Sequence, residues 1–566
     1  MKSKKALIIV FVVLAVAIAA VLGFNMKPSK EAEHDYFLAD QMTTMIILDA
    51  ANPGKIVKNL GHRNLSMPYV SKDDSTLILL ENSYGYPEAL DGNLIHFDLS
   101  SEVETLIAKN IDGFVVSSDF KTFLYMKEND STLYKKSVFD AEPEIIAKKV
   151  CSYYMSDDAQ TIIYTTTSDG TYLKNGTSEA ILLGKSVNIR HFEKTTGDFV
   201  YMVYDDASKL IVHKNGTDTV VTENLYTGDG PGHIGSCDTF YFFEEQEKLD
   251  PYSLFEDDLK ETLRLSDAEI DEFYNLLNID IPHNNSYFHL RKAFYYDNGK
   301  ISEVCDNIIE TVNSTARSPA DKVAAIFRCF DTETKIKLSD LYAYEIDPVF
   351  GVPYYSIILN LRSTYRVIKK EQIATTDLGT QNVWDCKYDY LNNEMYIFTS
   401  ENVNDVSLSN IYKTSLNIGS DELTLIDQND DIMLTTAAVF TDGIFYQRLN
   451  SSTYDFCHNG EILVSDIEYF YDMEADNAYY ISAFEGDNKK GILYFDGEIH
   501  EYPDIDLSSH SVYSTPKGNF IIWNIADEHY YTISGKDVLR FDGEFVNIDV
   551  PSEQPNNYEI STYFSK

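Results

Sequence analysis

The chain has 566 residues, of which 24% are charged and 13% aromatic, and its formal net charge is −44. A surface this acidic excludes a protein built to bind nucleic acid or anionic lipid, because such surfaces need Lys and Arg. The low Gly and Pro contents, 27 and 15 residues, argue against a disordered or fibrous chain. The length exceeds that of one ordinary domain, so repeats or several domains are expected.

The N-terminal part carries one long apolar run, residues 6–24, without a charged side chain. Its 19 positions give about 28 Å of helix, enough to cross the hydrocarbon core of a bilayer. Three Lys residues are the only charged side chains before it, which predicts a cytoplasmic tail over residues 1–5 and an exported remainder. We therefore expect a single-pass transmembrane signal anchor in the cell membrane, followed by a linker over residues 25–35.

A cleaved signal peptide is the alternative for this run. The apolar core of a signal peptide is usually about 7–15 residues, shorter than this one. Ala17-Ile18-Ala19 nevertheless offers a small-x-small cleavage site. No Cys follows the run closely, so a lipoprotein-type anchor is not indicated.

The exported part is strongly acidic and its cysteines are dispersed. Beyond residue 30, 41 Lys and Arg stand against all 90 Asp and Glu, a net charge of −49. This indicates a well-solvated exported protein or a surface that holds divalent or cationic partners. The cysteines show neither CxxC nor Cys/His ligand spacing, so no zinc site is indicated and free, buried thiols are expected, although their even number permits disulfides. They are Cys151, Cys237, Cys305, Cys329, Cys386 and Cys457.

A recurring unit is the most informative feature of the sequence. Residues 71–79, 117–125 and 156–164 share the pattern Ser-x-Asp-x-x-Thr followed by an apolar run. The three threonines are 46 and 39 residues apart, and a degenerate fourth copy covers residues 195–201. Ser and Asp side chains close turns on the backbone, and the apolar run after each turn predicts an inner strand.

A second series marks the other end of each unit, where Asn-Gly or Asp-Gly lies between two β-rich runs. Such dipeptides accept positive φ and close two-residue hairpins. Copies that follow one another directly are 40, 37 and 46 residues apart. The series comprises Asn175-Gly176, Asn215-Gly216, Asn298-Gly299, Asn459-Gly460, Asp496-Gly497 and Asp542-Gly543.

Each unit therefore predicts four strands in about 40 residues, which is the sheet of a β-propeller blade. The Ser-x-Asp-x-x-Thr runs resemble the Ser-Pro-Asp-Gly-Lys blade signature of TolB-like, WD40-like propellers, although these copies lack its Pro and Gly. The Tyr-Tyr-Asp-Asn-Gly-Lys run at 295–300 is similar to exported bacterial propellers of largely unknown function.

We expect an all-β fold, with propeller repeats over residues 36–550 as one large ring or two tandem rings, and a C-terminal tail or closure strand over residues 551–566. Ten or eleven blade-like units are predicted. They begin near residues 36, 69, 114, 153, 187, 233, 311, 383, 434, 469 and 511.

The repeat pattern loosens between residues 246 and 382. Ser266 and Glu269 form a capping box before apolar residues at helical spacing, which predicts a small helical insertion at about 246–290. Residues 321–330 fit a helix or a strand, and the repeat context favours a strand. The insertion is a place for a binding function or a helical cap over a sheet edge.

No linear catalytic motif occurs, because HExxH, GxSxG, P-loop and Rossmann glycine patterns are all absent. The glycine-rich run at 228–232 lacks the helix and Lys of a phosphate site. The acidic runs 256–258 and 427–431 offer oxygens to calcium, but they lack the spacing of a calcium loop and are expected to be solvated turns.

Isolated residues add no site. Trp384 and Trp523, the only tryptophans, lie in β-rich runs and are expected in the core between blades rather than on a sugar-binding surface. Four scattered histidines are expected to serve in packing or hydrogen bonding: His62, His191, His233 and His289. The sequence therefore assigns no catalytic, cofactor-binding or metal-binding residue, and the binding residues stay unknown.

A blade motif specifies a fold and no activity. The anchor, the repeated platform and the lack of a catalytic motif favour a non-catalytic binding or scaffold module for a protein, peptide or glycan at the cell envelope. No cofactor is indicated, with calcium the one candidate ion. The alternative is an envelope glycan-active enzyme with carboxylates lining the propeller channel, a site that a linear motif search misses. A sensory ectodomain is the third alternative, and residues 1–5 would then need a membrane partner to relay the signal.

Overall fold

The computed structural model describes residues between 36 and 553, with larger gaps at 82–90, 227–233, 247–289, 313–323 and 336–362 and shorter gaps in many loops. Every regular element in this described part is a β-strand, which confirms the predicted all-β class. The chain divides into two compact units. One comprises Met1–Ile111, Met473–Ala475 and Ser509–Gln554, and the other comprises Asp112–Asp472, Asp476–Ser508 and Pro555–Lys566.

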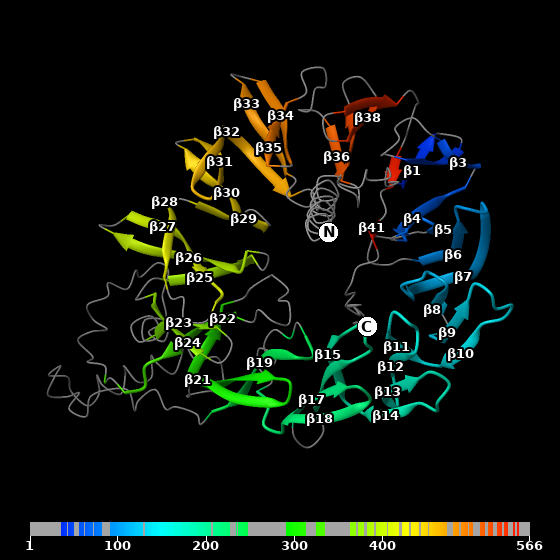
Figure 1. The fold of residues 1–566 in the computed structure, drawn as a ribbon, viewed down its shortest axis with the longest axis horizontal. Helices are drawn as coiled ribbons and strands as arrows, with labels where there is room; N and C mark the ends of the chain where they lie inside the picture. Colours follow the sequence, from blue (N-terminus) through cyan, green and yellow to red (C-terminus); the bar gives the residue numbers. More distant parts are fainter. Residues whose placement is uncertain are drawn as a thin grey trace, which may run out of the picture. The chain divides into compact units, whose positions relative to one another are not determined.

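The first unit contains three groups of strands, drawn in blue and in orange to red (Figure 1). One sheet has the order β3-β2-β1-β40, with β1 (Tyr36–Gln41), β2 (Thr44–Asp49), β3 (Ile56–Gly61) and β40 (Asn547–Asp549). Next come β4 (Leu65–Val70), β5 (Thr76–Glu81) and β6 (Asp91–Asp98), with β41 (Ser552–Glu553) parallel to β4. The third group is β36 (His510–Ser514), β37 (Phe520–Asn524), β38 (His529–Ser534) and β39 (Asp537–Phe541). Because β40 pairs with β1, the C-terminal part of the chain completes the N-terminal sheet.

The second unit is a series of antiparallel meanders. After β7 (Val103–Val116), which crosses the boundary between the units, come β8 (Thr122–Lys127), β9 (Leu133–Ser137) and β10 (Glu144–Ala147). Two four-stranded sheets follow: β11 (Val150–Met155), β12 (Thr161–Thr166), β13 (Gly170–Asn175) and β14 (Ile181–Gly184), then β15 (Val187–Phe192), β16 (Phe199–Tyr204), β17 (Ser208–Lys214) and β18 (Thr217–Thr222).

Three further sheets continue the series. The six-stranded one holds β19 (Thr239–Glu245), β20 (Arg291–Asp297), β21 (Lys300–Thr311), β22 (Ala324–Phe330), β23 (Ser363–Lys369) and β24 (Gln372–Asp377). The four-stranded one holds β25 (Asn382–Asp389), β26 (Glu394–Val403), β27 (Val406–Ser415) and β28 (Thr424–Asn429). The seven-stranded one holds β29 (Ile432–Phe440), β30 (Gly443–Asn450), β31 (Thr453–His458), β32 (Glu461–Asp472), β33 (Tyr479–Glu485), β34 (Asn488–Phe495) and β35 (Glu498–His500).

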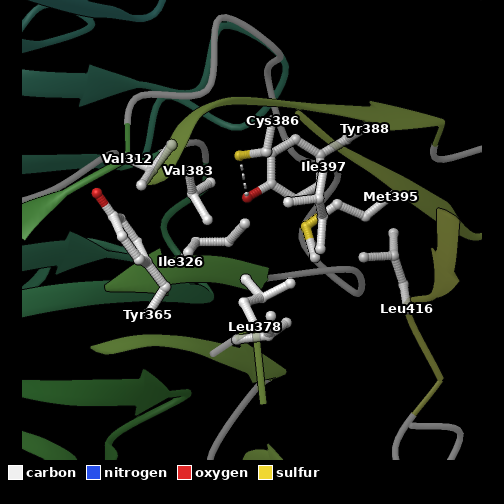
Figure 2. Close-up of a cluster of buried hydrophobic side chains, with 11 residues drawn as sticks. Val312, Ile326, Tyr365, Leu378, Val383, Cys386, Tyr388, Met395, Ile397 and Leu416 are labelled. Carbon is white, nitrogen blue, oxygen red and sulfur yellow. Dashed lines mark hydrogen bonds between the residues drawn. The ribbon is translucent and has the colours of Figure 1, made fainter. Parts of the chain in front are cut away.

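Consecutive sheets of the second unit pack face to face through apolar clusters. In one of them, Ile326 of β22 lies with Val383 of β25 and Met395 of β26, so that the cluster joins the six-stranded sheet to the next one (Figure 2). Four other clusters join the remaining neighbours in chain order, from the β8–β10 strands to the β29–β35 sheet. Serial packing of antiparallel meanders in this way is a propeller-type architecture.

Two long strands in the second unit each belong to two successive meanders. The first part of β21 pairs with β20 and its last part pairs with β22, and the change occurs at Ile308. In β32 the corresponding change, from β31 to β33, occurs at Ile467. The residue before each of these buried isoleucines, Asn307 or Asp466, has positive φ, 55° and 57° respectively. The units predicted near 311 and 469 are therefore hydrogen-bonded continuously to their predecessors.

The Ser-x-Asp-x-x-Thr pattern closes one turn in three places. Ser156 Oγ donates to Asp158 Oδ1 at 2.6 Å and accepts the Thr161 N–H at 2.9 Å. The turns that begin at Ser71 and Ser117 repeat both contacts. The fourth residue of each turn is in the left-handed region, where the resembling family has Gly. These residues are Asp74, Phe120 and Ala159, with φ of 54°, 58° and 56°.

The turns of successive meanders are also bonded to one another. The Ser118 N–H donates to the Asp157 carbonyl at 3.0 Å, and the Asp157 N–H donates to the Lys194 carbonyl at 2.8 Å. These three residues directly follow Ser117, Ser156 and Glu193, each of which begins a turn by donating its N–H to the carbonyl of the residue five positions on. The backbone link therefore repeats from one turn to the next and fixes their spacing.

The Asn-Gly dipeptides close tight hairpins where the chain keeps a two-residue loop. Asn215-Gly216, Asn298-Gly299 and Asn459-Gly460 all have positive φ at both positions, as a type I′ turn requires. The prediction of such a hairpin at Asn175-Gly176 is wrong, because β14 begins only at Ile181.

Several other expectations can be compared with the described residues. The predicted strand within 321–330 is confirmed as β22. The helical insertion at 246–290, the apolar run at 6–24 and Asp542-Gly543 lie outside the described residues. Within the part of the chain that the structure describes, no helix is long and apolar enough to span a membrane.

Gly197 and Gly216 form a matched pair for testing the packing between successive meanders. Their φ values are 75° and 76°, so an Ala at either position costs a similar amount, about 1–2 kcal/mol, for the left-handed backbone. A Cβ at Gly197 would lie 2.4 Å from Thr161 Oγ1, whereas one at Gly216 meets nothing within 4 Å. We expect Gly197→Ala to lower the free energy of unfolding more than Gly216→Ala does, by about a further 1–3 kcal/mol, because the added methyl group overpacks the contact with Thr161. Urea unfolding of the two variants measures the difference. Equal losses of stability in the two variants would show that Thr161 moves aside without cost.

Candidate functional site

The described residues bring one group of metal-ligand side chains together, His191, Glu193 and Cys237. His191 belongs to β15 and Glu193 follows that strand directly, while Cys237 lies in the turn that leads into β19. The three side chains therefore come from two consecutive sheets. The cysteine is one of the buried residues of the apolar cluster that joins these sheets.

The three side chains lie close enough to coordinate one metal ion. His191 Nε2 is 3.1 Å from Glu193 Oε2, and one ligand atom from each of the three residues lies within 4.8 Å of the other two. Cys237 is 4% exposed, whereas the His191 and Glu193 side chains are 11% and 38% exposed. The site is thus buried at the sulfur and accessible at the carboxylate.

Backbone hydrogen bonds hold the two turns that carry these residues. The Glu193 N–H donates to the Asp198 carbonyl at 2.8 Å, and the Gly197 N–H donates back to the Glu193 carbonyl at 2.8 Å. In the other turn, the Asp238 N–H donates to Ser236 Oγ at 2.9 Å and the Asp238 carbonyl accepts the Asn298 N–H at 2.8 Å.

The electrostatic surroundings of the sulfur are acidic. Burial raises the pKa of the Cys237 thiol, and the carboxylates of Glu193, Asp198 and Asp238 add to this effect. Lys214, which is ion-paired with Asp238, opposes it. A cation at the sulfur would therefore be favoured by the carboxylates around it.

Sequence reasoning missed this group, because it treated His191 as isolated and found no Cys/His ligand spacing. The spacing of the repeats gives no signal for it. The corresponding strands β16 and β19 begin at Phe199 and Thr239, so His191 and Cys237 hold different places in their repeats.

The acidic run at 427–431 does not form a solvated turn at its first residue. Asp427 lies in β28, where it accepts a 2.5 Å hydrogen bond from the Tyr446 hydroxyl and a 3.2 Å one from Arg448. Its carboxylate thus stabilises the contact between two sheets. Asp430 and Asp431, together with the 256–258 and 228–232 runs, lie outside the described residues.

The expectation that Trp384 lies in the core is wrong, because its side chain is 43% exposed. It sits at a bulge in β25, where the register with β26 shifts between Val383 and Asp385. The bulge turns the ring outward, which offers an aromatic face to solvent. Nothing is described for the side chain of Trp523, and His62, His233 and His289 lie outside the described residues.

All six cysteines are free thiols, and two of them are in contact. Cys305 Sγ in β21 lies 3.2 Å from Cys329 Sγ in β22. Arg366 Nη1 lies 3.7 Å from Cys305 Sγ. The hydrogen bond from the neighbouring thiol and the nearby guanidinium together lower the pKa of the Cys305 thiol.

We expect this pair to form a disulfide under oxidising conditions. The sulfurs need to approach by about 1 Å to reach the ~2.05 Å of a disulfide bond. The two thiols would lose two protons and two electrons, and glutathione disulfide would take them up and leave as two glutathione thiols. After oxidation of the full-length chain and alkylation in denaturant, mass spectrometry should find a Cys305–Cys329 linked peptide and alkylated Cys386. A Cys329→Ser variant should show no linked peptide and should carry Cys305 as the mixed disulfide with glutathione or alkylated, because no second thiol completes the exchange. A fully alkylated wild-type chain would contradict the expectation.

Comparisons with known proteins identify no family for this chain and give only distant similarities to solved structures. No protein-family model matches the chain, and no curated protein matches it. The β-propeller domain of the Trilobed protease from Pyrococcus furiosus is 11% identical with a TM-score of 0.23, covering 78% of this chain and 99% of that one. Pyrococcus horikoshii acylaminoacyl peptidase is 10% identical with a TM-score of 0.21, covering 83% of this chain and 57% of that one.

A third solved structure is the dihydro-heme d1 dehydrogenase NirN, 12% identical with a TM-score of 0.27, covering 71% of this chain and 75% of that one. At such low TM-scores these similarities carry no argument. The propeller-type architecture therefore rests on the serial packing of this chain's own sheets.

Proposed function

We propose that the protein is a membrane-anchored, extracytoplasmic propeller of the TolB-like, WD40-like type that acts as a non-catalytic binding or scaffold module at the cell envelope. The observation that carries the proposal is the row of backbone-linked turns, in which Ser118, Asp157 and Lys194 are bonded in succession. A row held in this way presents its side chains at fixed spacing. Pre-organised surfaces bind partners without the cost of ordering loops.

The chemistry of the surface narrows the partner class. The net charge of −44 steers basic proteins or peptides toward the chain and repels nucleic acid. The exposed ring of Trp384 supports a glycan as a further ligand class, because sugars stack on aromatic faces. The partner is thus a protein, peptide or glycan of the envelope.

A site-specific photocrosslinker can test the binding face in intact cells. We expect a crosslinker at Lys121 or Gln160, exposed in two of the linked turns, to capture the same macromolecule. The control is Ile181, an exposed residue of the edge strand β14. The captured partner should then bind the purified full-length chain, and more weakly as salt rises, because charge attraction is screened. Equal capture at Ile181, or capture at neither turn, would contradict the proposed face.

Membrane anchoring can be tested through the apolar run at 6–24. Arg at positions 14 and 16, as Leu14→Arg with Val16→Arg, adds about 2.5–3.5 kcal/mol per residue to membrane insertion. The wild-type chain should stay in the membrane after alkaline extraction and be digested by protease added outside. The double variant should be lost from the exported fraction. A mature N-terminus just after Ala19 would establish the cleaved signal peptide instead.

A further inference from the structure

We propose that His191, Glu193 and Cys237 form a binding site for a divalent transition-metal ion of the zinc type. Imidazole nitrogen, thiolate sulfur and carboxylate oxygen are the three ligand classes that zinc accepts in proteins. The proposal goes beyond the scaffold function and does not depend on it. It rests on the approach of these three side chains from two consecutive sheets.

The distances suit such an ion after small rotamer changes. With metal–ligand bonds of about 2.0–2.3 Å, a tetrahedral site places ligand atoms roughly 3.3–3.8 Å apart. The His191–Glu193 pair is already at 3.1 Å, and the whole group lies within 4.8 Å. The Glu193 side chain is the most exposed of the three, so it can rotate toward the sulfur without disturbing the core.

Glu193 occupies a position that other repeats use for a structural Ser. In the turn at Ser156, the Ser156 N–H donates to the carbonyl of the residue five positions on, and the Ser side chain completes the turn. The Glu193 N–H makes the same backbone bond, to the Asp198 carbonyl. The Glu193 side chain, however, is directed to His191 instead of into its own turn. In this degenerate repeat the Glu193 carboxylate is therefore free to face His191, whereas the turns at Ser71, Ser117 and Ser156 use a Ser hydroxyl at this position to close the turn.

The surroundings support a bound cation. Asp198 and Asp238 add negative charge around Cys237, and Lys214 is held by Asp238 and by Asn298 Oδ1, the latter at 3.0 Å. Asp198 itself is fixed, since its Oδ1 accepts the Asn215 N–H at 2.8 Å. Negative charge near the sulfur favours a bound cation.

Binding of the ion would release one proton and would leave one coordination position for water. The ion replaces the proton of the Cys237 thiol, which passes to water, and the imidazole binds in its neutral form. Three protein ligands leave a fourth position for water. Because His191 and Glu193 lie at the end of β15 and Cys237 lies in the turn before β19, the ion would cross-link two successive sheets.

Co²⁺ is the spectroscopic probe for this site, and the experiment uses the purified full-length chain at high salt with excess Mg²⁺ to suppress binding to surface carboxylates. We expect one Co²⁺ per chain, a near-ultraviolet thiolate-to-cobalt charge-transfer band, and displacement of both by Zn²⁺. Cys237→Ser should abolish the band. Glu193→Gln, which changes an accessible side chain, should keep the band and weaken Co²⁺ binding at least ~10-fold.

Two controls address the other thiols. Cys151→Ser removes a half-buried thiol elsewhere, and Cys305→Ser with Cys329→Ser removes the contacting pair, so both should leave the band unchanged. Zn²⁺ should raise the thermal midpoint of the wild-type chain and of these controls but not that of Cys237→Ser. No charge-transfer band in the wild-type chain, or a band that survives in Cys237→Ser, would overturn the proposal. Loss of the band in the Cys305/Cys329 variant would place the metal there instead.

Discussion

The structure depends on the burial of both faces of the central strands in its sheets. The central strands show this directly, because five consecutive residues are buried in β5, in β16 and in β19. In a strand, alternate side chains point to opposite faces, so an unbroken buried run needs a neighbour on each side. One meander of about 40 residues cannot satisfy that need alone. Serial packing of meanders follows, and with it every apolar cluster between consecutive sheets of the second unit.

Given that constraint, the turns decide the spacing of the sheets. Ser156 and Asp158 close their turn locally, and Asp157 ties it to the next turn through Lys194. The same device recurs at Ser117 with different neighbours. The proposed metal site arises where this device is altered, at Glu193. In a repeat protein, a binding site can thus arise where one repeat replaces the residue that closes the turn in the other repeats.

Much of the fold could be predicted because the relevant interactions are local. A Ser-x-Asp turn and an Asn-Gly hairpin involve a few neighbouring residues, and three hairpins have the expected backbone. Residues such as Phe120 and Ala159 hold a left-handed conformation without Gly, since the side-chain contacts of the turn outweigh the cost. The hairpin predicted at Asn175 failed because the dipeptide alone does not fix loop length.

The side-chain groups were beyond sequence reasoning because they join distant residues. The contact of Cys305 with Cys329, the pairing of Asp427 with Tyr446 and the approach of Cys237 to His191 each depend on the register or packing of neighbouring sheets. Trp384 failed for a related reason: a single bulge reverses which face a residue occupies. Periodicity predicts strands, but the bulges that redirect them leave little trace in the sequence.

The shared strands β21 and β32 determine which meanders of the second unit unfold together. Each is one uninterrupted covalent and hydrogen-bonded element that serves two meanders and changes partners at Ile308 or Ile467. Pulling either meander away strips the strand from the other as well. Their amide protons should therefore exchange with solvent in pairs of meanders, and the cooperative unit in opening is the pair that shares the strand, β19–β24 or β29–β35, not the single repeat.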